Sequence, residues 1–282
     1  MYFWHTSRFR IDLSKPRVMG IVNITPDSFS DGGHFGSTSS ALAQGEALLR
    51  EGADILDLGA ESTRPGALAL SEDQELARLL PVLREAVRWG VPISVDTYKP
   101  GVMQAALDVG ADIINDVWAL RWVEPGSART GVDVLANHSS CGVCLMHMHG
   151  DPATMQVSPM QGDALAPVMA FLQSRIAALQ ARAVGPERMV IDPGIGFGKT
   201  VEQNFSLLAR QSALLALGVP VLAGWSRKSS LGAVTGAGPA DRVVASATAA
   251  ALAVQQGARV VRVHDVHATV QALQVLAAVQ VA

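Results

Sequence analysis

The strongest constraint on the fold is a repeated alternation of short β-rich segments with longer helical segments. Eight such pairs follow one another without a long linker or a low-complexity tract. The predicted strands span residues 17–23, 53–59, 91–96, 111–117, 142–147, 188–192, 219–224 and 259–264. The predicted helices span about 37–51, 71–89, 100–109, 127–137, 160–183, 200–216, 239–257 and 266–279. This alternation favours a parallel sheet, because each helix returns the chain to the start of the next strand.

Eight strand–helix units predict an α/β fold with a single closed (β/α)8 TIM barrel. The length of 282 residues agrees with one barrel domain that occupies residues 1–282. Residues 1–16 precede the first predicted strand and form a short N-terminal extension of that domain. An open, doubly wound parallel sheet is the alternative architecture.

Composition narrows the class of partners and the cellular location. Charged residues make up 17% of the chain and the net charge is -3, so no electrostatic feature favours a nucleic-acid partner. Two cysteines exclude a disulfide framework and indicate a reducing, cytoplasmic location. The first residues lack an apolar core of signal-peptide length, and no apolar run reaches the ~18 residues of a membrane span. We therefore expect no membrane association.

Polar side chains occur in the last residues of several predicted strands, and the last strand carries two of them, two positions apart. They are Asn23, Asp96, Asn115, Asp192, Arg262 and His264. In a barrel, the carboxyl ends of the strands meet at one rim, which carries the active site. Side chains alternate along a strand, so these residues share the inward face with apolar residues two positions earlier. Each one alone could cap the following helix, but their number favours a common site.

Two motifs suggest other chemistries that the sequence argues against. The run "GIGFGKT" resembles a phosphate-binding P-loop, but the glycine that this motif needs is replaced by Pro193. Cys141 and Cys144 form "CGVC" within a strand, where they face opposite sides, whereas a zinc site places such a pair on a turn. We interpret both cysteines as small core residues.

Asp57 lies inside a strand and requires a buried partner, which the sequence does not identify. Lys228, in "SRKS" at a strand end, is a candidate ligand for an electron-rich group.

Taken together, the motifs resemble those of the dihydropteroate synthase family. The matching segments, in the family's order, are "GIVNITPDSFSDGG", "GAESTRPGA", "SVDT", "INDV", "LMHMHGDPATMQ", "DPGIGFGKT", "SRKS" and "RVHDV". They cover the chain from about residue 17 to 266. The resemblance implies a pterin-binding (β/α)8 barrel, a transferase of folate biosynthesis. It would condense 6-hydroxymethyl-7,8-dihydropterin diphosphate with 4-aminobenzoate to give dihydropteroate and pyrophosphate. Members of the family are usually homodimers, use Mg2+ and are the target of sulfonamides.

The resemblance also implies roles for residues of the pterin pocket. Asp192 would accept hydrogen bonds from the 2-amino and N3–H edge of the pterin, since a carboxylate has paired acceptor oxygens. Asn115 would bind the neighbouring edge, and Asp96 would accept from the reduced ring. Lys228 would donate to the carbonyl and N5. Met146 and Phe197 would form the walls around the flat ring.

The remaining implied roles concern the diphosphate, the metal ion and the second substrate. The diphosphate would bind to Thr63, Arg262 and His264, with arginine suited to phosphate by its planar fork. Asn23 would ligate Mg2+, directly or through water. Ser226 and the turn of Thr63, Arg64 and Pro65 would border the aminobenzoate. The family assigns catalysis to Asp31, Lys228 and Arg262.

In this interpretation, the first motif, "GIVNITPDSFSDGG", provides a mobile loop after the first predicted strand. Loss of pyrophosphate would leave a resonance-stabilised pterin cation, with Phe29 covering the flat ring and Asp31 facing the charge. An ordinary Asp-Gly turn is the alternative interpretation of this loop.

Three residues, Trp225, His149 and Cys144, depart from the family's usual residues and affect the expected substrate affinity. Two other functions remain: a methyltetrahydrofolate-dependent methyltransferase of the same fold, and a catalytically silent pterin-binding paralogue.

Overall fold

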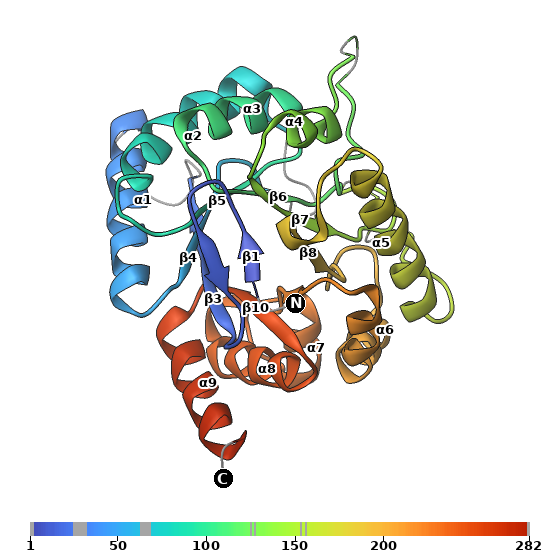
Figure 1. The fold of residues 1–282 in the computed structure, drawn as a ribbon. Helices are drawn as coiled ribbons and strands as arrows, with labels where there is room; N and C mark the ends of the chain where they lie inside the picture. The colour runs from blue at the N-terminus through green and yellow to red at the C-terminus, as the bar shows by residue number, and fades with distance from the viewer. Residues whose placement is uncertain are drawn as a thin grey trace.

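The computed structural model describes residues 3–24, 33–62, 69–124, 126, 128–152, 154, 155 and 157–280. Within these residues, eight parallel strands close into a barrel in the order β10-β3-β4-β5-β6-β7-β8-β9 (Figure 1). The barrel strands are β3 (Arg17–Asn23), β4 (Ile55–Gly59), β5 (Ile93–Asp96), β6 (Ile113–Asp116), β7 (Gly142–Met146), β8 (Met189–Asp192), β9 (Val221–Ala223) and β10 (Ala258–Val263). The closed barrel confirms the predicted (β/α)8 fold and excludes the open sheet.

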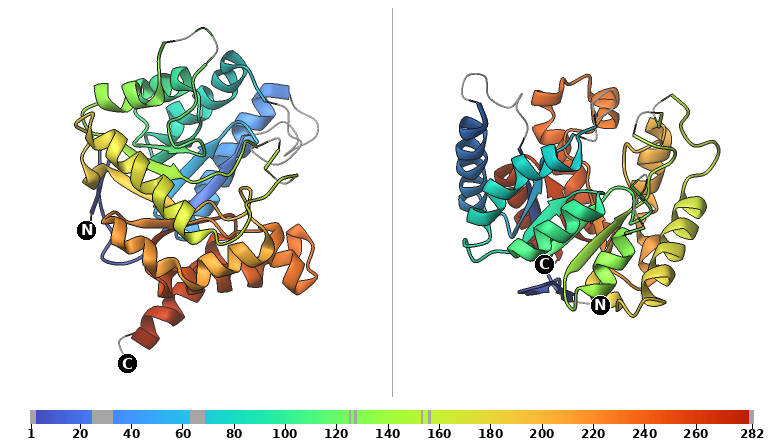
Figure 2. Two further views of the ribbon diagram at one scale, coloured as in Figure 1. Left: turned by 90° about the vertical axis from the view of Figure 1, so that its right-hand side faces the viewer. Right: turned by 90° about the horizontal axis from the view of Figure 1, so that it is seen from above.

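The helices form a layer around the barrel (Figure 2). They are α1 (Gly33–Arg50), α2 (Glu72–Ala86), α3 (Pro100–Val109), α4 (Gly131–Asn137), α5 (Leu165–Gln180), α6 (Val201–Ala209), α7 (Ser229–Thr235), α8 (Val243–Gln255) and α9 (Val266–Gln280), with 3-10 turns η2 (Pro186–Arg188), η3 (Gln211–Leu217) and η4 (Pro239–Asp241). Local sequence sets several of their starts. Ser71, Thr130 and Thr200 each accept the amide of the third helical residue in a reciprocal capping box.

Two separate apolar layers result from the alternation of side chains along the barrel strands. The barrel interior is filled by Met19, Ile55, Ile113, Cys144, Val190, Leu222 and Val260. A larger cluster, which includes Cys141, fills the space between the strands and the helices. Cys141, directly before β7, and Cys144, within it, therefore pack on opposite sides of the barrel wall, and both are free thiols.

The N-terminal extension closes the barrel at the end opposite the carboxyl termini of the strands. Its antiparallel hairpin consists of β1 (Phe3–His5) and β2 (Arg10–Asp12), and β1 lies across the barrel centre in Figure 1. Trp4 and Leu13 are fully buried against the interior layer. The indole of Trp4 donates a hydrogen bond to the carbonyl of Arg188, with an N–O distance of 3.0 Å. No function was predicted for residues 1–16, and the structure shows that the described part of this segment forms the floor of the barrel.

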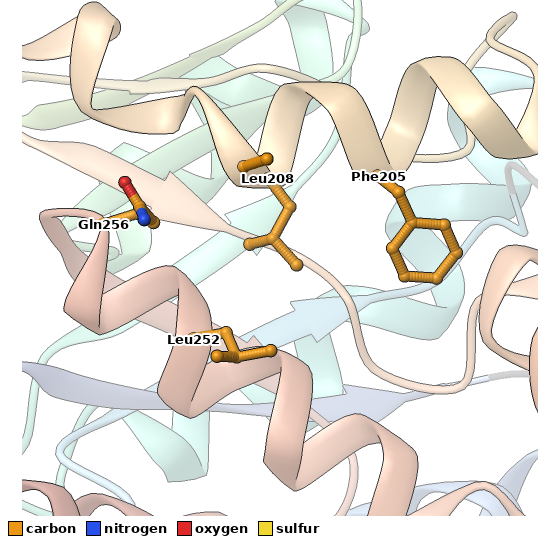
Figure 3. A pocket seen from close by; sticks show the side chains of 5 residues that line it. Phe205, Leu208, Leu252 and Gln256 are labelled. Atoms are coloured by element: carbon orange, nitrogen blue, oxygen red, sulfur yellow. The ribbon is translucent and has the colours of Figure 1, made fainter.

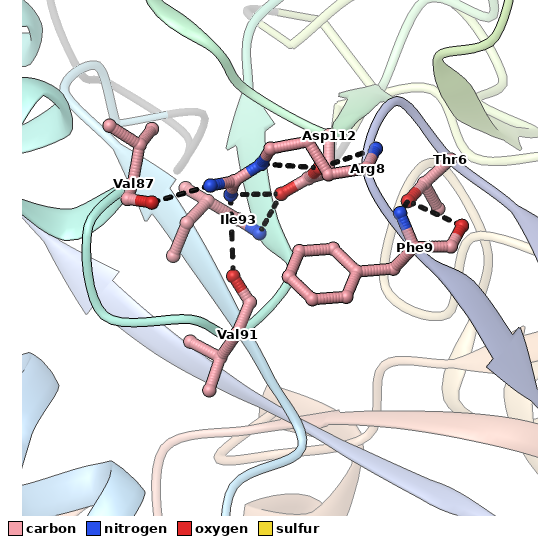
Figure 4. A network of polar contacts seen from close by, with 7 residues as sticks. All are labelled: Thr6, Arg8, Phe9, Val87, Val91, Ile93 and Asp112. Atoms are coloured by element: carbon pink, nitrogen blue, oxygen red, sulfur yellow. Dashed lines mark hydrogen bonds and ion pairs between the residues drawn. The ribbon is translucent and has the colours of Figure 1, made fainter.

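Arg8 fastens the hairpin to the barrel through the buried carboxylate of Asp112 (Figure 4). Its Nε and Nη2 donate to Asp112 at 3.0 and 2.6 Å, and its backbone N–H donates at 3.1 Å. Asp112 also accepts the amide of Ile93 at 2.8 Å. A carboxylate with no exposed surface thus receives four N–H donors, which compensate for its removal from water.

Several helix boundaries differ from the prediction. The predicted helix at 160–183 begins only at Leu165, and the one at 200–216 gives way to the 3-10 turn η3 after Ala209. The seven-residue α7 was not predicted. None of the helices among the described residues is long and apolar enough to cross a membrane.

Candidate active site

Arg262 holds two carboxylates from other strands together at the carboxyl end of the barrel. Its Nε donates to Oδ2 of Asp57 at 2.6 Å, and its Nη2 donates to Oδ2 of Asp96 at 2.7 Å. Asp57 belongs to β4 and Asp96 ends β5, whereas Arg262 belongs to β10. The structure therefore brings two predicted site residues, Arg262 and Asp96, into direct contact. It also identifies the buried partner that Asp57 requires.

Asp57 is the centre of this polar cluster and has no exposed surface. Besides Arg262, it accepts hydrogen bonds from the hydroxyl of Ser94 at 2.6 Å and from the amide Nδ2 of Asn115 at 3.2 Å. Because a carboxylate accepts only from the nitrogen of an amide, this bond fixes the orientation of the Asn115 side chain. The Oδ1 acceptor of Asn115 is then directed away from Asp57.

Burial perturbs the charged groups of the cluster. It raises the pKa of Asp96 to about 7, although the guanidinium of Arg262 acts in the opposite direction. Burial acts to lower the pKa of Arg262, but the carboxylates of Asp57 and Asp96 outweigh it and the pKa rises. Arg262 thus stays charged, while the proton on Asp96 can be exchanged near neutral pH.

A second polar group lies at the end of β8. Oδ1 of Asp192 accepts the amide of Gly194 at 2.7 Å, and burial raises the pKa of this carboxyl. The ammonium of Lys228 lies 4.3 Å from the ring centroid of Phe197. The charge of Lys228 opposes the effect of burial on Asp192. Asp192, Phe197 and Lys228, all predicted site residues, therefore form one neighbourhood.

Met146 belongs to an apolar and aromatic cluster beside this neighbourhood. The cluster contains Tyr98, Val117, Met146, Met148 and Met155, and Trp118, Trp122 and Phe197 pack against it. The rings of Tyr98 and Trp122 meet edge to face with centroids 5.0 Å apart. Sequence reasoning did not select Tyr98, Trp118 or Trp122. The position of Tyr98 and Trp118, two residues after the ends of β5 and β6, was the available signal.

Ser226 and His264 are joined through a pair of hydrogen bonds. The backbone N–H of His264 donates to Oγ of Ser226 at 3.0 Å, and the same oxygen lies 3.0 Å from Nδ1 of the His264 ring. Between Ser226 and Lys228, Arg227 has a left-handed backbone with φ 58° and forms an ion pair with Asp265 at 2.6 Å. This ion pair connects the segment after β9 to the segment after β10.

A buried ion cluster that the sequence did not predict lies at the ends of β4 and β5. The ammonium of Lys99 forms ion pairs with Glu61 and, at 2.6 Å, with Glu75. Tyr98 donates its hydroxyl to Glu61 at 2.9 Å. Burial acts to lower the pKa of Lys99, but the two carboxylates outweigh it and raise the pKa. Glu61 is thereby fixed immediately before the predicted Thr63 segment.

Some predicted site residues lie outside the described residues: Phe29, Asp31, Thr63, Arg64 and Pro65. Asn23 is described and ends β3, where its register partner on β4 is Gly59. Trp225, one of the unusual residues, has only 1% of its surface exposed and contacts the ring of Phe205 behind the site. Cys144 lies in the barrel interior below Asp192 and Asp57.

The fold and the polar barrel end define a class of enzyme. The family model described as "Pterin binding enzyme" matches residues 19–264 of the chain. The chain therefore belongs to the family of pterin-binding enzymes.

More specific relatives are found within this family. The chain is 48% identical to dihydropteroate synthase of Neisseria meningitidis serogroup B, over 97% of this chain and 96% of that protein. It resembles the Xanthomonas albilineans dihydropteroate synthase solved with 4-aminobenzoic acid, with a TM-score of 0.89, 49% identity, and coverage of 97% of this chain and 96% of that one. It also resembles the Burkholderia cenocepacia dihydropteroate synthase complexed with 7,8-dihydropteroate, with a TM-score of 0.86, 44% identity, and coverage of 99% and 96%. Within its family, the chain belongs to the dihydropteroate synthases.

Proposed function

We propose that the chain condenses 6-hydroxymethyl-7,8-dihydropterin diphosphate with 4-aminobenzoate to form 7,8-dihydropteroate and pyrophosphate. One observation carries the proposal: the cluster in which Arg262, Asp96 and Asn115 meet around the buried carboxylate of Asp57. It presents oriented polar groups at the end of the barrel where such enzymes bind substrates. The named relatives support the same reaction.

Pterin recognition is assigned to three side chains. One oxygen of Asp192 is occupied by the amide of Gly194, which leaves the second oxygen for donors on the pterin edge. The amide orientation of Asn115 supplies an additional acceptor, Oδ1, rather than a donor. Lys228, which lies over the ring of Phe197, supplies the cationic donor for the pterin carbonyl and N5. This division matches a ligand with several N–H donors and one electron-rich edge.

The departing diphosphate is assigned to Arg262 and His264. A guanidinium has five N–H donors, and those that do not bind Asp57 and Asp96 remain for phosphate oxygens. Since the Ser226 hydroxyl accepts the backbone N–H of His264, its own proton can be donated to Nδ1. A neutral His264 would then carry its proton on Nε2 and donate it to the leaving group. Both side chains stabilise charge that develops as the C–O bond breaks.

The reaction needs no covalent enzyme intermediate. The bond between the pterin CH2 and the diphosphate oxygen breaks with both electrons on oxygen, which leaves a pterin cation. The amine of 4-aminobenzoate then forms the new C–N bond and loses a proton. The chain's contribution is to orient the ring, hold the diphosphate and stabilise the separated charges. Phe29 and Asp31 keep the roles expected from the sequence, the cover over the ring and the charge near the cation.

Mg2+ is proposed as the metal ion, with Asn23 as the protein ligand. The amide oxygen of Asn23 is a hard donor at the end of β3, and the described residues group no three acidic, histidine or cysteine side chains into a metal cage. Such a sparse donor set fits Mg2+, which keeps several waters and binds substrate phosphates. When bound, the ion would neutralise charge on the diphosphate.

The proposal includes a homodimer in a reducing cytoplasm. An apolar groove lies between α6 and α8 on the outer helix layer (Figure 3). It is lined by Phe205, Leu208, Ala209, Leu252 and Gln256. Leu252 retains 45% of its surface exposed, and such a surface fits contact with a second copy. The two free cysteines fit a reducing compartment.

The test is pyrophosphate release by the purified protein. We expect release only when the pterin diphosphate, 4-aminobenzoate and Mg2+ are all present, with dihydropteroate formed in equal amount. Pterin binding without turnover would instead support the silent paralogue. Methyl transfer from methyltetrahydrofolate, with no pyrophosphate formed, would support the methyltransferase.

A further inference from the structure

Lys199 is a buried lysine that the proposed reaction does not use. Only 4% of its surface is exposed, although its motif resembles a phosphate-binding loop in sequence. Its ammonium donates hydrogen bonds to three backbone carbonyls: Gly194 at 2.8 Å, Phe197 at 3.1 Å and His147 at 3.3 Å. Three N–H donors therefore meet three carbonyl oxygens, which is the full donor capacity of a lysine.

Three glycines give the segment 193–200 the backbone that surrounds this ammonium. Gly194, Gly196 and Gly198 have φ values of 71°, 81° and 73°, which side chains other than glycine rarely adopt. A Cβ on Gly194 would lie 1.8 Å from the carbonyl oxygen of His147 and 3.3 Å from Nζ of Lys199. Gly194 therefore packs directly against the backbone of His147 after β7, and the ammonium of Lys199 lies beside this contact.

Two of the carbonyls that Lys199 holds, those of Gly194 and Phe197, belong to the segment that carries two pterin-binding residues. Gly194 donates its amide to Asp192 at 2.7 Å, and its carbonyl accepts the amide of Phe197 at 3.1 Å. His147 donates its own amide to the carbonyl of Asp192 at 3.0 Å. The positions of the Asp192 carboxylate and the Phe197 ring thus depend on the same small network that Lys199 closes.

The charges that face Lys199 come from neighbouring strands. Burial lowers the pKa of Lys199 to about 7, Asp192 on β8 opposes this effect, and Lys228 after β9 adds to it. His147, at the end of β7, has a pKa lowered to about 3 by burial and by Lys199, so it is neutral at physiological pH. Lys199 in turn acts to lower the pKa of Asp192.

We propose that Lys199 is a positioning residue for pterin binding: its ammonium ties the carbonyls of His147, Gly194 and Phe197 together and thereby sets the Asp192 carboxylate and the Phe197 wall. The inference rests on the proposed function, because it assumes that Asp192 and Phe197 bind the pterin. It adds a residue that touches no substrate but determines the shape of the pterin pocket. The glycine-rich motif, in this view, surrounds a lysine of its own chain rather than a phosphate.

The proposal implies a pH dependence with a defined sign. The ammonium has three N–H donors, but the neutral amine has two donors and a lone pair, so one carbonyl loses its partner on deprotonation. The pterin pocket is therefore complete below the pKa of Lys199 and loosens as the pH rises through it. Pterin affinity should fall above about pH 7 for this reason.

The test compares Lys199→Met with wild type. Methionine has an unbranched side chain one heavy atom shorter than that of lysine and removes every donor, so we expect pterin affinity measured by calorimetry to fall by about tenfold or more. KM for the pterin diphosphate should rise by a similar factor, while KM for 4-aminobenzoate at saturating pterin changes by less than about twofold. Amide hydrogen exchange should accelerate in residues 194–199 and not in the barrel strands. Lys15→Met, at an exposed position, is the matched control and should behave as wild type.

The pH profile separates positioning from a merely structural role. The pterin dissociation constant of wild type should rise between about pH 6 and 8.5. The dissociation constant of Lys199→Met should rise less over the same range, and the difference between the two profiles measures the effect of deprotonating Lys199. Identical profiles, or unchanged pterin affinity in a folded Lys199→Met, would overturn the inference. If that variant does not fold, Lys199→Gln, which keeps two N–H donors without charge, provides the same comparison. If neither folds, wild-type amide exchange in residues 194–199 decides: after correction for intrinsic rates, no change across this pH range overturns the inference. Absence of pterin binding and turnover in wild type would instead overturn the proposed function.

Discussion

At the scale of single residues, the active end of the barrel is organised around carboxylates that are already paired within the protein. Asp57 receives Arg262, Asn115 and Ser94, and Asp192 receives the amide of Gly194. These bonds fix the orientations of Arg262, Asn115 and Asp192, which are the side chains proposed to bind the substrate. Such preorganisation lowers the cost of ordering these groups when the ligand binds.

Asp192→Asn tests the assignment of the pterin edge. The Oδ1 of asparagine can keep the bond to Gly194, so its NH2 group would face the N–H donors of the pterin. A buried donor opposite a donor costs on the order of 1–3 kcal/mol, and calorimetry should show pterin affinity lower by about 5- to 150-fold. An affinity equal to that of wild type, in a variant with unchanged thermal stability, would show that another carboxylate reads this edge.

Arg262→Ala tests the diphosphate assignment and the stability of the cluster together. Pyrophosphate affinity should fall far more than affinity for a pterin that lacks the diphosphate. The substitution also leaves Asp57 buried without its cation, which lowers the free energy of unfolding by roughly 3–5 kcal/mol.

The stability loss in Arg262→Ala should depend on pH. Arg262 opposes the rise that burial causes in the pKa of Asp96, so without Arg262 this folded-state pKa lies still further above the unfolded value of about 3.9. The folded state is therefore favoured where Asp96 is protonated, and it is destabilised as the pH rises through the folded pKa. Urea unfolding at pH 5 should therefore show a smaller loss than at pH 8. Arg262→Ala combined with Asp57→Asn should restore stability but not pyrophosphate binding; recovery of both would make Arg262 a structural residue only.

The sequence predicted which side chains face the barrel end but not their partners. Alternation along each strand places Asn115, Asp192 and Arg262 on the inward face, and the family motifs supply roles for them. Periodicity does not tell how far a long side chain reaches across the barrel, so the contact of Arg262 with Asp57 was not predictable. Lys99 with Glu61 and Glu75 was missed for the same reason, because these residues come from different segments.

At the scale of elements, the hairpin of β1 and β2 acts as the floor of the barrel. Arg8→Ala removes the guanidinium that binds Asp112 and the carbonyls of Val87 and Val91 (Figure 4). Because Arg8 is partly exposed and Asp112 keeps backbone donors, we expect a loss of about 1–3 kcal/mol in the free energy of unfolding. Among the described residues, Arg10→Ala on the same hairpin removes a stacking contact with the ring of Phe3 and should cost less than about 1 kcal/mol.

Urea unfolding of both variants, with KM for the pterin diphosphate measured beside it, checks this prediction. The hairpin lies at the end opposite the site, so KM should stay at the wild-type value in both. Equal losses of stability in the two variants would mean that the Arg8–Asp112 contact does not fasten the floor.

Most barrel elements could be predicted from sequence because each is long enough to show its period and is followed by a turn signal. The hairpin escaped because its strands have three residues each, too few for alternation to be visible. Helix α7 was not predicted because its seven residues include Gly232 and resemble a loop. The early end of α6 was equally hidden, since η3 continues the apolar pattern in a 3-10 conformation.

At the scale of the whole molecule, the two ends and the outer layer of the barrel have different structural and functional roles. The hairpin closes one end, the polar cluster occupies the other, and the helices cover the sides (Figures 1 and 2). The groove between α6 and α8 lies on this outer layer, so a second copy could bind there without covering the described site residues. Dimer formation and catalysis should then be separable by substitution.

Leu252→Glu is the corresponding test of the proposed homodimer. A buried, unpaired carboxylate costs roughly 1–3 kcal/mol by mutational measures, and a twofold interface contains it twice. The dimer dissociation constant should therefore rise by at least about 30-fold, which sedimentation velocity across a concentration series can measure. Val275→Glu on α9 replaces an apolar residue that is 67% exposed and serves as the control, with no effect expected. If Val275→Glu dissociates the dimer and Leu252→Glu does not, the interface lies on α9; a wild-type protein that sediments as a monomer at micromolar concentration contradicts the homodimer itself.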